Sequence, residues 1–93
     1  MPTISIITTT YKHSAFIADT IESILAQSYT DWELLIGDDS PDDATWKIIE
    51  TYVAKYPDRI HAWHHTPNKG IVENMKFLVH QTSDQTQILS FLE

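Results

Sequence analysis

Asp38 and Asp39 are adjacent carboxylates, and they are the residues of this chain best suited to ligand chemistry. They follow a short, bounded apolar run at residues 34–36, which is typical of a buried strand in a parallel sheet. Open α/β sheets bind ligands outside the carboxyl ends of their strands. The pattern therefore predicts that at least one of these carboxylates contacts a ligand, against the simpler alternative that one only caps the following turn.

Thr9 and Tyr11 lie at the end of an earlier β-branched run, residues 4–9, and parallel strands would bring them to the same edge. A tyrosine there can present its ring to a planar base and its hydroxyl to a polar atom. Packing of Tyr11 over the next helix fits the sequence equally well. Lys12 and Lys69 are the cations expected near this edge, although an ordinary surface position is the commoner role for a lysine.

Any phosphate bound at this edge would need a cation. With only two glycines in the chain, there is neither a dinucleotide fingerprint nor a Walker loop, so Lys, Arg or a metal ion would have to neutralise the phosphate. His61, His64 and His65 form only a weak metal-binding pattern, because the two on one strand face are too far apart to chelate easily. No nucleophile elbow and no cysteine is present, so a catalytic base is expected only beyond residue 93.

The elements that would position these residues alternate between strands and helices. Strands are expected at residues 4–9, 34–36, 59–65 and 88–92. Helices are expected from a Ser14 cap to about residue 27, from Asp42 or Asp43 to the stop at Pro57, and over residues 72–81. The apolar positions assigned to the first and third helices include Phe16, Val72 and Val79. The order βαβαβαβ predicts an α/β fold with an open, mainly parallel sheet.

Composition and charge limit the partners. The 93 residues carry a formal net charge of −7, with only six Lys and Arg, which argues against nucleic acid and anionic membranes. The lack of Cys excludes disulfides, and no signal peptide or membrane-length apolar run is apparent, so a cytoplasmic domain is expected. Because the sequence stops at Glu93, directly after the last predicted strand, we expect the amino-terminal part of a longer protein rather than a complete small domain.

Four segments, in order and at the right intervals, are similar to motifs of one known family. They are Thr9-Thr10-Tyr11-Lys12, Ser23-Ile24-Leu25-Ala26-Gln27-Ser28-Tyr29, Asp31-Trp32-Glu33-Leu34 with Asp38-Asp39-Ser40-Pro41-Asp42-Asp43, and Asn68-Lys69-Gly70 with Asn74. On these motifs, essentially the whole chain resembles the amino-terminal half of a family 2 glycosyltransferase with the GT-A fold. The chain departs from the family pattern at Lys12, where Asn is commoner, and after Asp39, where Gly or Asn is usual.

The resemblance implies a glycosyltransferase that moves a sugar from a nucleotide-diphosphate sugar, UDP- or dTDP-linked, to an acceptor hydroxyl, in synthesis of a polysaccharide or cell-surface glycan. Carried over by position, Thr9 and Tyr11 would flank the base, Asp39 would hold it, Asp38 would support the ribose side or the turn, and Lys69 would lie near the base or phosphates. Mg²⁺ or Mn²⁺ is implied, with its ligands beyond the chain, since Glu93 stands near the first acidic position of the family's metal motif.

Residues 1–93 would then be the nucleotide-binding part of a GT-A domain, inactive alone, with any membrane association supplied by other parts. Its uncovered sheet edge and apolar surface predict a fragment that self-associates. Two alternatives stay open: a non-enzymatic nucleotide-binding α/β module, and a nucleotidyltransferase. The second would need a Gly-rich or basic phosphate loop near the first strand, which residues 9–13 do not supply.

Overall fold

Strands and helices alternate along the whole described chain. The computed structural model describes residues 4–28, 31–65, 67, 69–82 and 87–90. Its elements are β1 (Ile4–Thr10), α1 (Ile17–Leu25), β2 (Trp32–Asp38), α2 (Ala44–Lys55), β3 (Ile60–His64), α3 (Ile71–Gln81) and β4 (Gln87–Ser90). The predicted order βαβαβαβ is confirmed, and of the strand predicted at residues 88–92, residues 91 and 92 lie outside the described ranges.

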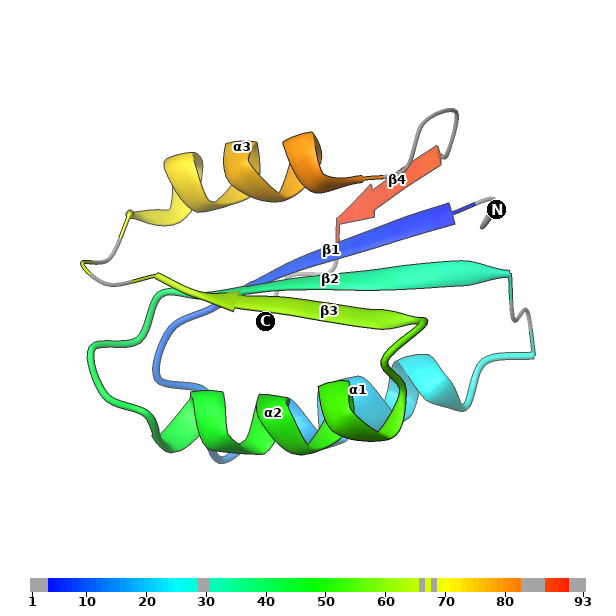
Figure 1. Ribbon diagram of the computed structural model, residues 1–93, viewed down its shortest axis with the longest axis horizontal. Helices are drawn as coiled ribbons and strands as arrows, with labels where there is room; N and C mark the ends of the chain where they lie inside the picture. The colour runs from blue at the N-terminus through cyan, green and yellow to red at the C-terminus, as the bar shows by residue number, and fades with distance from the viewer. Residues whose placement is uncertain (1–3, 29–30, 66, 68, 83–86, 91–93) are drawn as a thin grey trace.

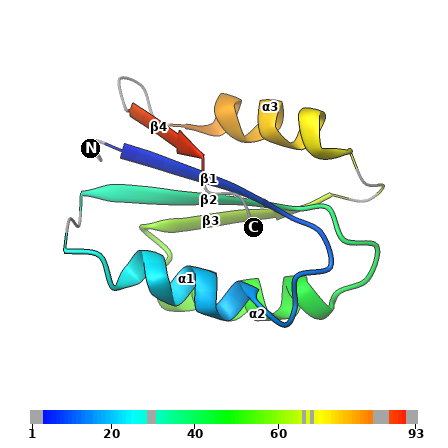
Figure 2. The same ribbon diagram turned by 180° about the vertical axis from the view of Figure 1, so that it is seen from behind.

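The four strands form one parallel sheet in the order β3-β2-β1-β4. Helices α1 and α2 cover one face of this sheet and α3 covers the other, as Figures 1 and 2 show from opposite sides. The chain adds β2 and β3 on one side of β1 and then crosses to place β4 on the other side. The strand order therefore reverses beside β1, which is where open α/β sheets form their ligand crevice, outside the carboxyl ends of the strands.

Two apolar layers hold the sheet between the helices, and alternation along each strand decides which layer a side chain joins. The larger layer faces α1 and α2 and contains these buried residues: Ile6, Ile17, Ile21, Ile24, Trp32, Leu34, Ile36, Ile49 and Ile60. The smaller layer faces α3 and joins Ile7, Leu35 and Leu78, with Trp63, Met75 and Phe77 packed against it. Consecutive strand residues therefore serve different layers, which matters for the two aspartates at the end of β2.

Three apolar residues assigned to helix faces that pack on the sheet are in fact exposed: Phe16 is 63% exposed, Val72 61% and Val79 42%. Of the four apolar residues assigned to α3, Leu78 is buried and Met75 packs against the smaller layer, whereas Val72 and Val79 face outward and the polar Asn74 is buried instead. Two overlapping stripes satisfy the same period, so the pattern alone could not choose between them.

The predicted Ser14 cap of the first helix is also wrong. Helix α1 begins at Ile17 with Phe16 in the N-cap position, and no side chain caps it. Instead, the backbone carbonyl of His13 accepts hydrogen bonds from the amides of Phe16 and Ile17, at 2.9 and 2.8 Å. The turn over residues 13–17 therefore satisfies helix-start donors with backbone alone.

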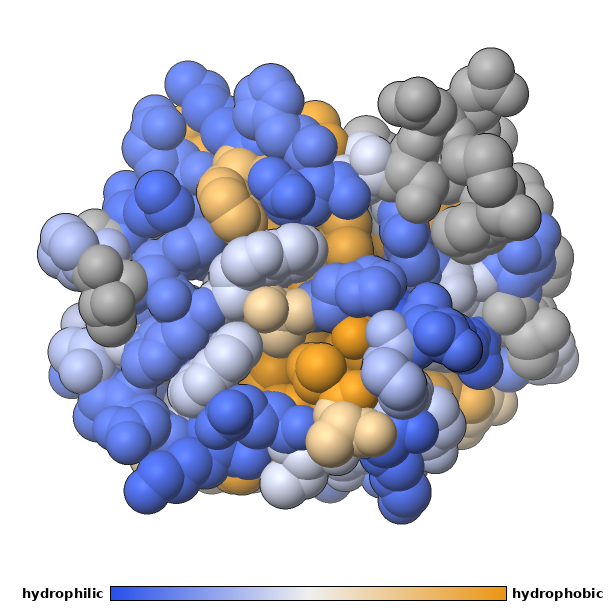
Figure 3. All heavy atoms as spheres, viewed as in Figure 1, coloured by the Kyte–Doolittle hydropathy of each residue, from blue (hydrophilic) through white to orange (hydrophobic). Residues whose placement is uncertain are grey.

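Figure 3, seen from the same side as Figure 1, shows apolar residues between the sheet and α2, framed by hydrophilic ones. The residues of the larger layer are themselves buried, and partly buried residues packed against it, among them Val53 of α2 and Ala62 of β3, contribute apolar surface. Within the described ranges, no helix combines the length and the apolar character that crossing a bilayer requires.

Candidate functional site

Asp38 and Asp39 both lie at the carboxyl edge of the sheet, as predicted, but they bond to opposite layers. Asp38 is the last residue of β2 and bonds to groups on the α1 and α2 side, while Asp39 bonds to the start of α3. Successive residues of an extended chain point to opposite faces, so this divergence follows from the strand itself. Both carboxylates are buried, at 0% and 5% exposure. The pair is therefore two sites with different neighbours rather than one acidic cluster.

The Asp38 carboxylate is occupied by neighbouring protein groups. Its Oδ1 atom accepts hydrogen bonds from Thr10 Oγ1 at 3.0 Å, from the Ser40 amide at 3.1 Å and from Ser40 Oγ at 2.6 Å. Its buried Oδ2 atom has no hydrogen-bond partner among the described residues, and His64 Nε2 lies 3.9 Å away. These bonds fit the predicted support of the turn, whereas ligand contact by Asp38 stays a prediction.

Ser40, in the loop after β2, contacts the loop that follows β1 and the last residue of β3. Its hydroxyl accepts a hydrogen bond from the Lys12 amide at 2.7 Å, and its carbonyl oxygen lies 3.0 Å from His64 Nε2. The His64 ring in turn stacks on Trp46 of α2, with centroids 5.4 Å apart. Sequence reasoning weighed His64 only as part of a weak metal-binding pattern and Ser40 only as part of a motif, since neither residue type by itself indicates a link between loops.

The Asp39 carboxylate holds the segment that leads into α3. Oδ1 accepts a hydrogen bond from the Lys69 amide at 2.6 Å, and Oδ2 accepts one from the Gly70 amide at 2.8 Å. The Asp39 amide donates to the Thr10 carbonyl at 2.9 Å, which ties the same residue to the end of β1. An ionised carboxylate offers about four acceptor sites, so roughly two stay free after these bonds. Asp39 can accept a further donor without losing its own supports.

Asn74 of α3 locks this helix against the sheet. It is 1% exposed, donates from Nδ2 to the Gly37 carbonyl at 2.9 Å, and its Oδ1 lies 2.9 Å from His65 Nε2. The His65 ring packs edge-on against Phe77, with centroids 4.8 Å apart. A Cβ atom at position 37 would overlap Asn74 Oδ1, so the contact requires glycine there. The sequence showed Asn74 only as a motif match, without this function.

The other predicted site residues lie around the two carboxylates. Thr9 is 8% exposed and pairs with Gly37 across β1 and β2. Tyr11 is 48% exposed, so it is not packed away under α1, and Lys12 Nζ lies 5.4 Å from its ring centroid. Lys69 reaches Asp39 through its backbone amide, while its Nζ lies 5.6 Å from the Phe77 ring centroid. Asp38, Asp39 and Lys69 are thus tied into hydrogen-bonded loops, and Tyr11 presents its ring to solvent.

The described residues do not by themselves fit a divalent cation. Among them, no group of three His, Cys, Asp or Glu side chains is placed to hold a metal ion. The carboxylates of Asp38 and Asp39 already accept protein hydrogen bonds, and a divalent cation prefers several oxygen ligands around one point. The predicted ligands lie beyond residue 93, and Glu93 itself is outside the described ranges.

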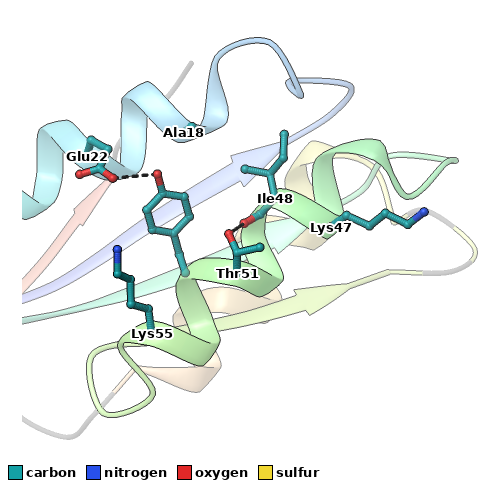
Figure 4. Close-up of a pocket in the computed structure, with 7 residues that line it drawn as sticks. Ala18, Glu22, Lys47, Ile48, Thr51 and Lys55 are labelled. Atoms are coloured by element: carbon teal, nitrogen blue, oxygen red, sulfur yellow. Dashed lines mark hydrogen bonds between the residues drawn. The ribbon is translucent and has the colours of Figure 1, made fainter.

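A separate hollow of about 410 Å³ lies between α1 and α2 (Figure 4). Across it, the Tyr52 hydroxyl donates to Glu22 Oε2 at 2.8 Å. This hydrogen bond, more than partial burial and the nearby carboxylates, raises the pKa of Tyr52 above its ordinary 10.0. The hollow is lined by Ala18, Glu22, Lys47, Ile48, Thr51, Tyr52 and Lys55.

The chain forms an open parallel α/β sheet, the class of fold in which ligands bind outside the carboxyl ends of the strands. The family model described as "Glycosyl transferase family 2" matches residues 5–92. The chain therefore belongs to glycosyl transferase family 2, as the motifs predicted.

Curated relatives and a solved structure agree with this assignment. The chain is 39% identical over 84 residues to EpsE of Bacillus subtilis, named as a glycosyltransferase, covering 89% of this chain and 30% of EpsE. It is 39% identical over 69 residues to TuaG of the same organism, named as a teichuronic acid biosynthesis glycosyltransferase, covering 74% of this chain and 27% of TuaG. The chain thus spans less than a third of the length of these relatives.

The solved structure of the mannosyltransferase PcManGT from Pyrobaculum calidifontis, in complex with GDP-Man and Mn²⁺, superposes with a TM-score of 0.78. The two sequences are 19% identical, and the alignment covers 88% of this chain and 25% of PcManGT. This likeness confirms the predicted GT-A fold.

Proposed function

We propose that the protein to which these residues belong transfers a sugar from a nucleotide-diphosphate sugar, UDP- or dTDP-linked, to an acceptor hydroxyl during synthesis of a polysaccharide or cell-surface glycan. Residues 1–93 form its nucleotide-binding portion. Membership of glycosyl transferase family 2 supports the reaction class. The name of TuaG supports the kind of product, and the complex of PcManGT with GDP-Man and Mn²⁺ supports the kind of donor.

One observation carries the proposal for this chain: Asp39 lies beside the end of β1 with acceptor capacity left over. Two backbone amides fix its carboxylate from the α3 side, and its own amide is fixed to Thr10. Such a group is preorganised, so binding a ligand donor costs little reordering. Tyr11, half exposed at the end of the adjacent strand, supplies a ring on which a planar base can stack.

The chemistry of Asp39 selects among bases. Uracil and thymine carry an N3–H donor between two carbonyl acceptors, while cytosine carries an unprotonated acceptor nitrogen at that position. An ionised carboxylate can only accept, so Asp39 favours uracil or thymine and disfavours cytosine. Guanine also has a ring N–H, so Asp39 alone does not exclude it. This is the basis for a UDP- or dTDP-linked donor.

Charge requires a further component for the diphosphate. The chain is acidic and lacks a Gly-rich phosphate loop, and Lys69 and Lys12 are the cations near this edge. Mg²⁺ or Mn²⁺, held by residues outside the described ranges, would neutralise the phosphates when bound. Within the described chain, Lys69 lies at the start of α3 and is the proposed phosphate- or base-side cation.

Nucleotide binding by the full-length protein tests this proposal. A charge-assisted hydrogen bond contributes on the order of 1.5–3 kcal/mol, so Asp39→Ala should weaken UDP binding roughly ten- to a hundredfold in calorimetry with Mn²⁺ present. Asp43→Ala removes a carboxylate that is 65% exposed and is the matched control, expected to leave affinity unchanged. Equal UDP affinity in the Asp39 variant and the wild type would overturn the proposal.

A further inference from the structure

At the carboxyl edge, the amide, the hydroxyl and the carbonyl oxygen of Ser40 all make polar contacts. Ser40 is 0% exposed, its amide and hydroxyl both donate to Asp38 Oδ1, and its hydroxyl oxygen accepts from the Lys12 amide. Its carbonyl oxygen faces His64 Nε2 at 3.0 Å. Four polar contacts from one small side chain and its peptide groups therefore converge on the loop that follows β2.

The backbone conformation of Lys12 explains why its hydrogen bond to the Ser40 hydroxyl is important. Its φ angle is +56°, in the left-handed region that non-glycine residues rarely adopt. Asn adopts this region more readily than Lys. Having Lys instead of the commoner Asn at position 12 therefore raises the conformational cost of this turn. A side-chain hydroxyl that accepts the Lys12 amide at 2.7 Å offsets this cost by fixing the strained peptide.

The fixed peptide is the one that joins Tyr11 to Lys12. Its orientation limits the Tyr11 backbone, and hence the range of directions open to the ring of this residue, which is 48% exposed as a whole. The ring contact that the structure shows, Lys12 Nζ at 5.4 Å from the ring centroid, comes from the same turn, so the backbone anchor bears directly on the placement of the ring. Asp38 Oδ1, which is buried from solvent, accepts a hydrogen bond from the Ser40 hydroxyl and so fixes its orientation.

From this chain of contacts we propose that Ser40 is a positioning residue: it holds the Tyr11 turn in the left-handed conformation that aims the Tyr11 ring at the nucleotide base. The inference rests on the proposed function, because it gives Tyr11 a base to contact. It assigns Ser40 a role in nucleotide affinity without direct contact with the nucleotide.

A double-mutant cycle on UDP affinity in the full-length protein tests this role. Ser40→Ala should weaken UDP binding about fivefold, and Tyr11→Ala about tenfold. If Ser40 acts through Tyr11, the Tyr11→Ala substitution should cost only about twofold in the Ser40→Ala background, because coupled residues are not additive. The cycle of Ser40→Ala with Thr9→Ala is the matched control and should be additive, since Thr9 is fixed by the β1–β2 ladder. If Ser40 had a merely structural role, the cycle with Tyr11 and the cycle with Thr9 would give the same coupling energy.

Two further variants keep the test decisive. Ser23→Ala makes the same chemical change at an exposed α1 hydroxyl bonded to the Asp19 carbonyl, and should leave UDP affinity unchanged. If Ser40→Ala does not fold, Ser40→Cys takes its place in the cycle, because a thiol fills the site with the same branching, although it is somewhat larger, and is a weak acceptor for the Lys12 amide.

The outcomes separate the inference from the function on which it rests. Coupling of Ser40 with Tyr11 and additivity with Thr9 support the positioning role. Additivity of Ser40 with Tyr11 in a protein that binds UDP overturns that role and leaves the proposed function standing. No UDP binding by the wild-type protein overturns both.

Discussion

The carboxyl edge of the sheet and the hollow between α1 and α2 differ in almost every physical respect. At the edge, Asp38, Ser40 and Asn74 are at most 1% exposed, and each makes several hydrogen bonds to other elements. In the hollow, one hydrogen bond between Tyr52 and Glu22 spans two helices at the surface. The edge has the ordered polar groups, and the hollow has the open volume of about 410 Å³.

Because the proposed site lies at the carboxyl edge, open volume alone would not have indicated it in this chain. A ligand site needs polar groups that are held in place before the ligand arrives. Buried groups that each make two or more hydrogen bonds meet that requirement. The lysines lining the hollow, Lys47 and Lys55, are exposed, and Lys47 makes a surface ion pair with Asp43 at 3.9 Å, a kind of contact that contributes little order. Substitutions at the two regions should therefore differ strongly in their consequences, and the predictions that follow begin with the largest.

Asp38→Ala should have the largest effect on stability. It leaves the Thr10 hydroxyl and both donors of Ser40 buried without their acceptor, which should lower the free energy of unfolding by about 3 kcal/mol. Urea unfolding followed by circular dichroism measures the loss. Asp43→Ala, at an exposed carboxylate, is the control and should change stability by less than about 0.5 kcal/mol. A similar, small effect at both positions would contradict the contrast between regions.

Gly37→Ala should have the next largest effect. The added methyl overlaps Asn74 Oδ1, and relieving the overlap should cost about 2 kcal/mol of unfolding free energy. The variant Asn74→Ala loses the bonds to Gly37 and His65 and is itself destabilised, but it opens space for the methyl. In thermal melts, Gly37→Ala should therefore cost much less in the Asn74→Ala background than in the wild type. An undiminished cost there would show that the overlap is not the cause.

Tyr52→Phe in the hollow should have the smallest effect. The lost hydrogen bond to Glu22 lies at the surface, so the free energy of unfolding should fall by at most about 0.5 kcal/mol. Because that bond raises the pKa of Tyr52 above 10.0, the stabilisation by the hydroxyl is complete below pH 10 and is lost as the pH rises through the folded-state pKa.

Urea unfolding of the two proteins at about pH 8 and above pH 10 checks the Tyr52 prediction. The difference between wild type and Tyr52→Phe should shrink at the higher pH. A difference that is constant with pH would mean that the hydroxyl acts by packing rather than through its proton.

The order of elements could be predicted because the spacing of apolar residues differs between strands and helices, and short apolar runs such as the one before Asp38 indicate buried strands. The sequence also predicted which edge gathers the polar residues, because parallel strands place all their carboxyl ends together. For α3 it assigned Met75 and Leu78, which do pack on the sheet, together with Val72 and Val79, which are exposed. It missed the buried Asn74, because no helical period reveals a contact with Gly37.

The links between loops were beyond reach of the sequence for a different reason. Ser40 bonds to Lys12, which is 28 residues away, and His64 to Ser40, which is 24 residues away. No local pattern specifies such pairs, because they exist only once the three strands lie side by side. The motif around Asp39 indicated that this loop belongs to the predicted site, and the structure shows the hydrogen bonds that fix the loop in place.

The central claim is that Asp39 reads the base of a nucleotide, and base discrimination by an Asp39→Asn variant tests it most directly. An amide can turn its NH₂ group toward cytosine N3, which a carboxylate cannot do. The substitution also weakens the support from Lys69 and Gly70, but such damage lowers affinity for every base and cancels in the ratio of two dissociation constants.

The measurement is calorimetry of UDP and CDP binding to the full-length protein, with Mg²⁺ or Mn²⁺ present, for the wild type and for Asp39→Asn. The wild type should prefer UDP, and the variant should narrow the gap between UDP and CDP. Equal binding of both nucleotides by the wild type, or an undiminished preference for UDP in the variant, would contradict the claim that Asp39 reads the base.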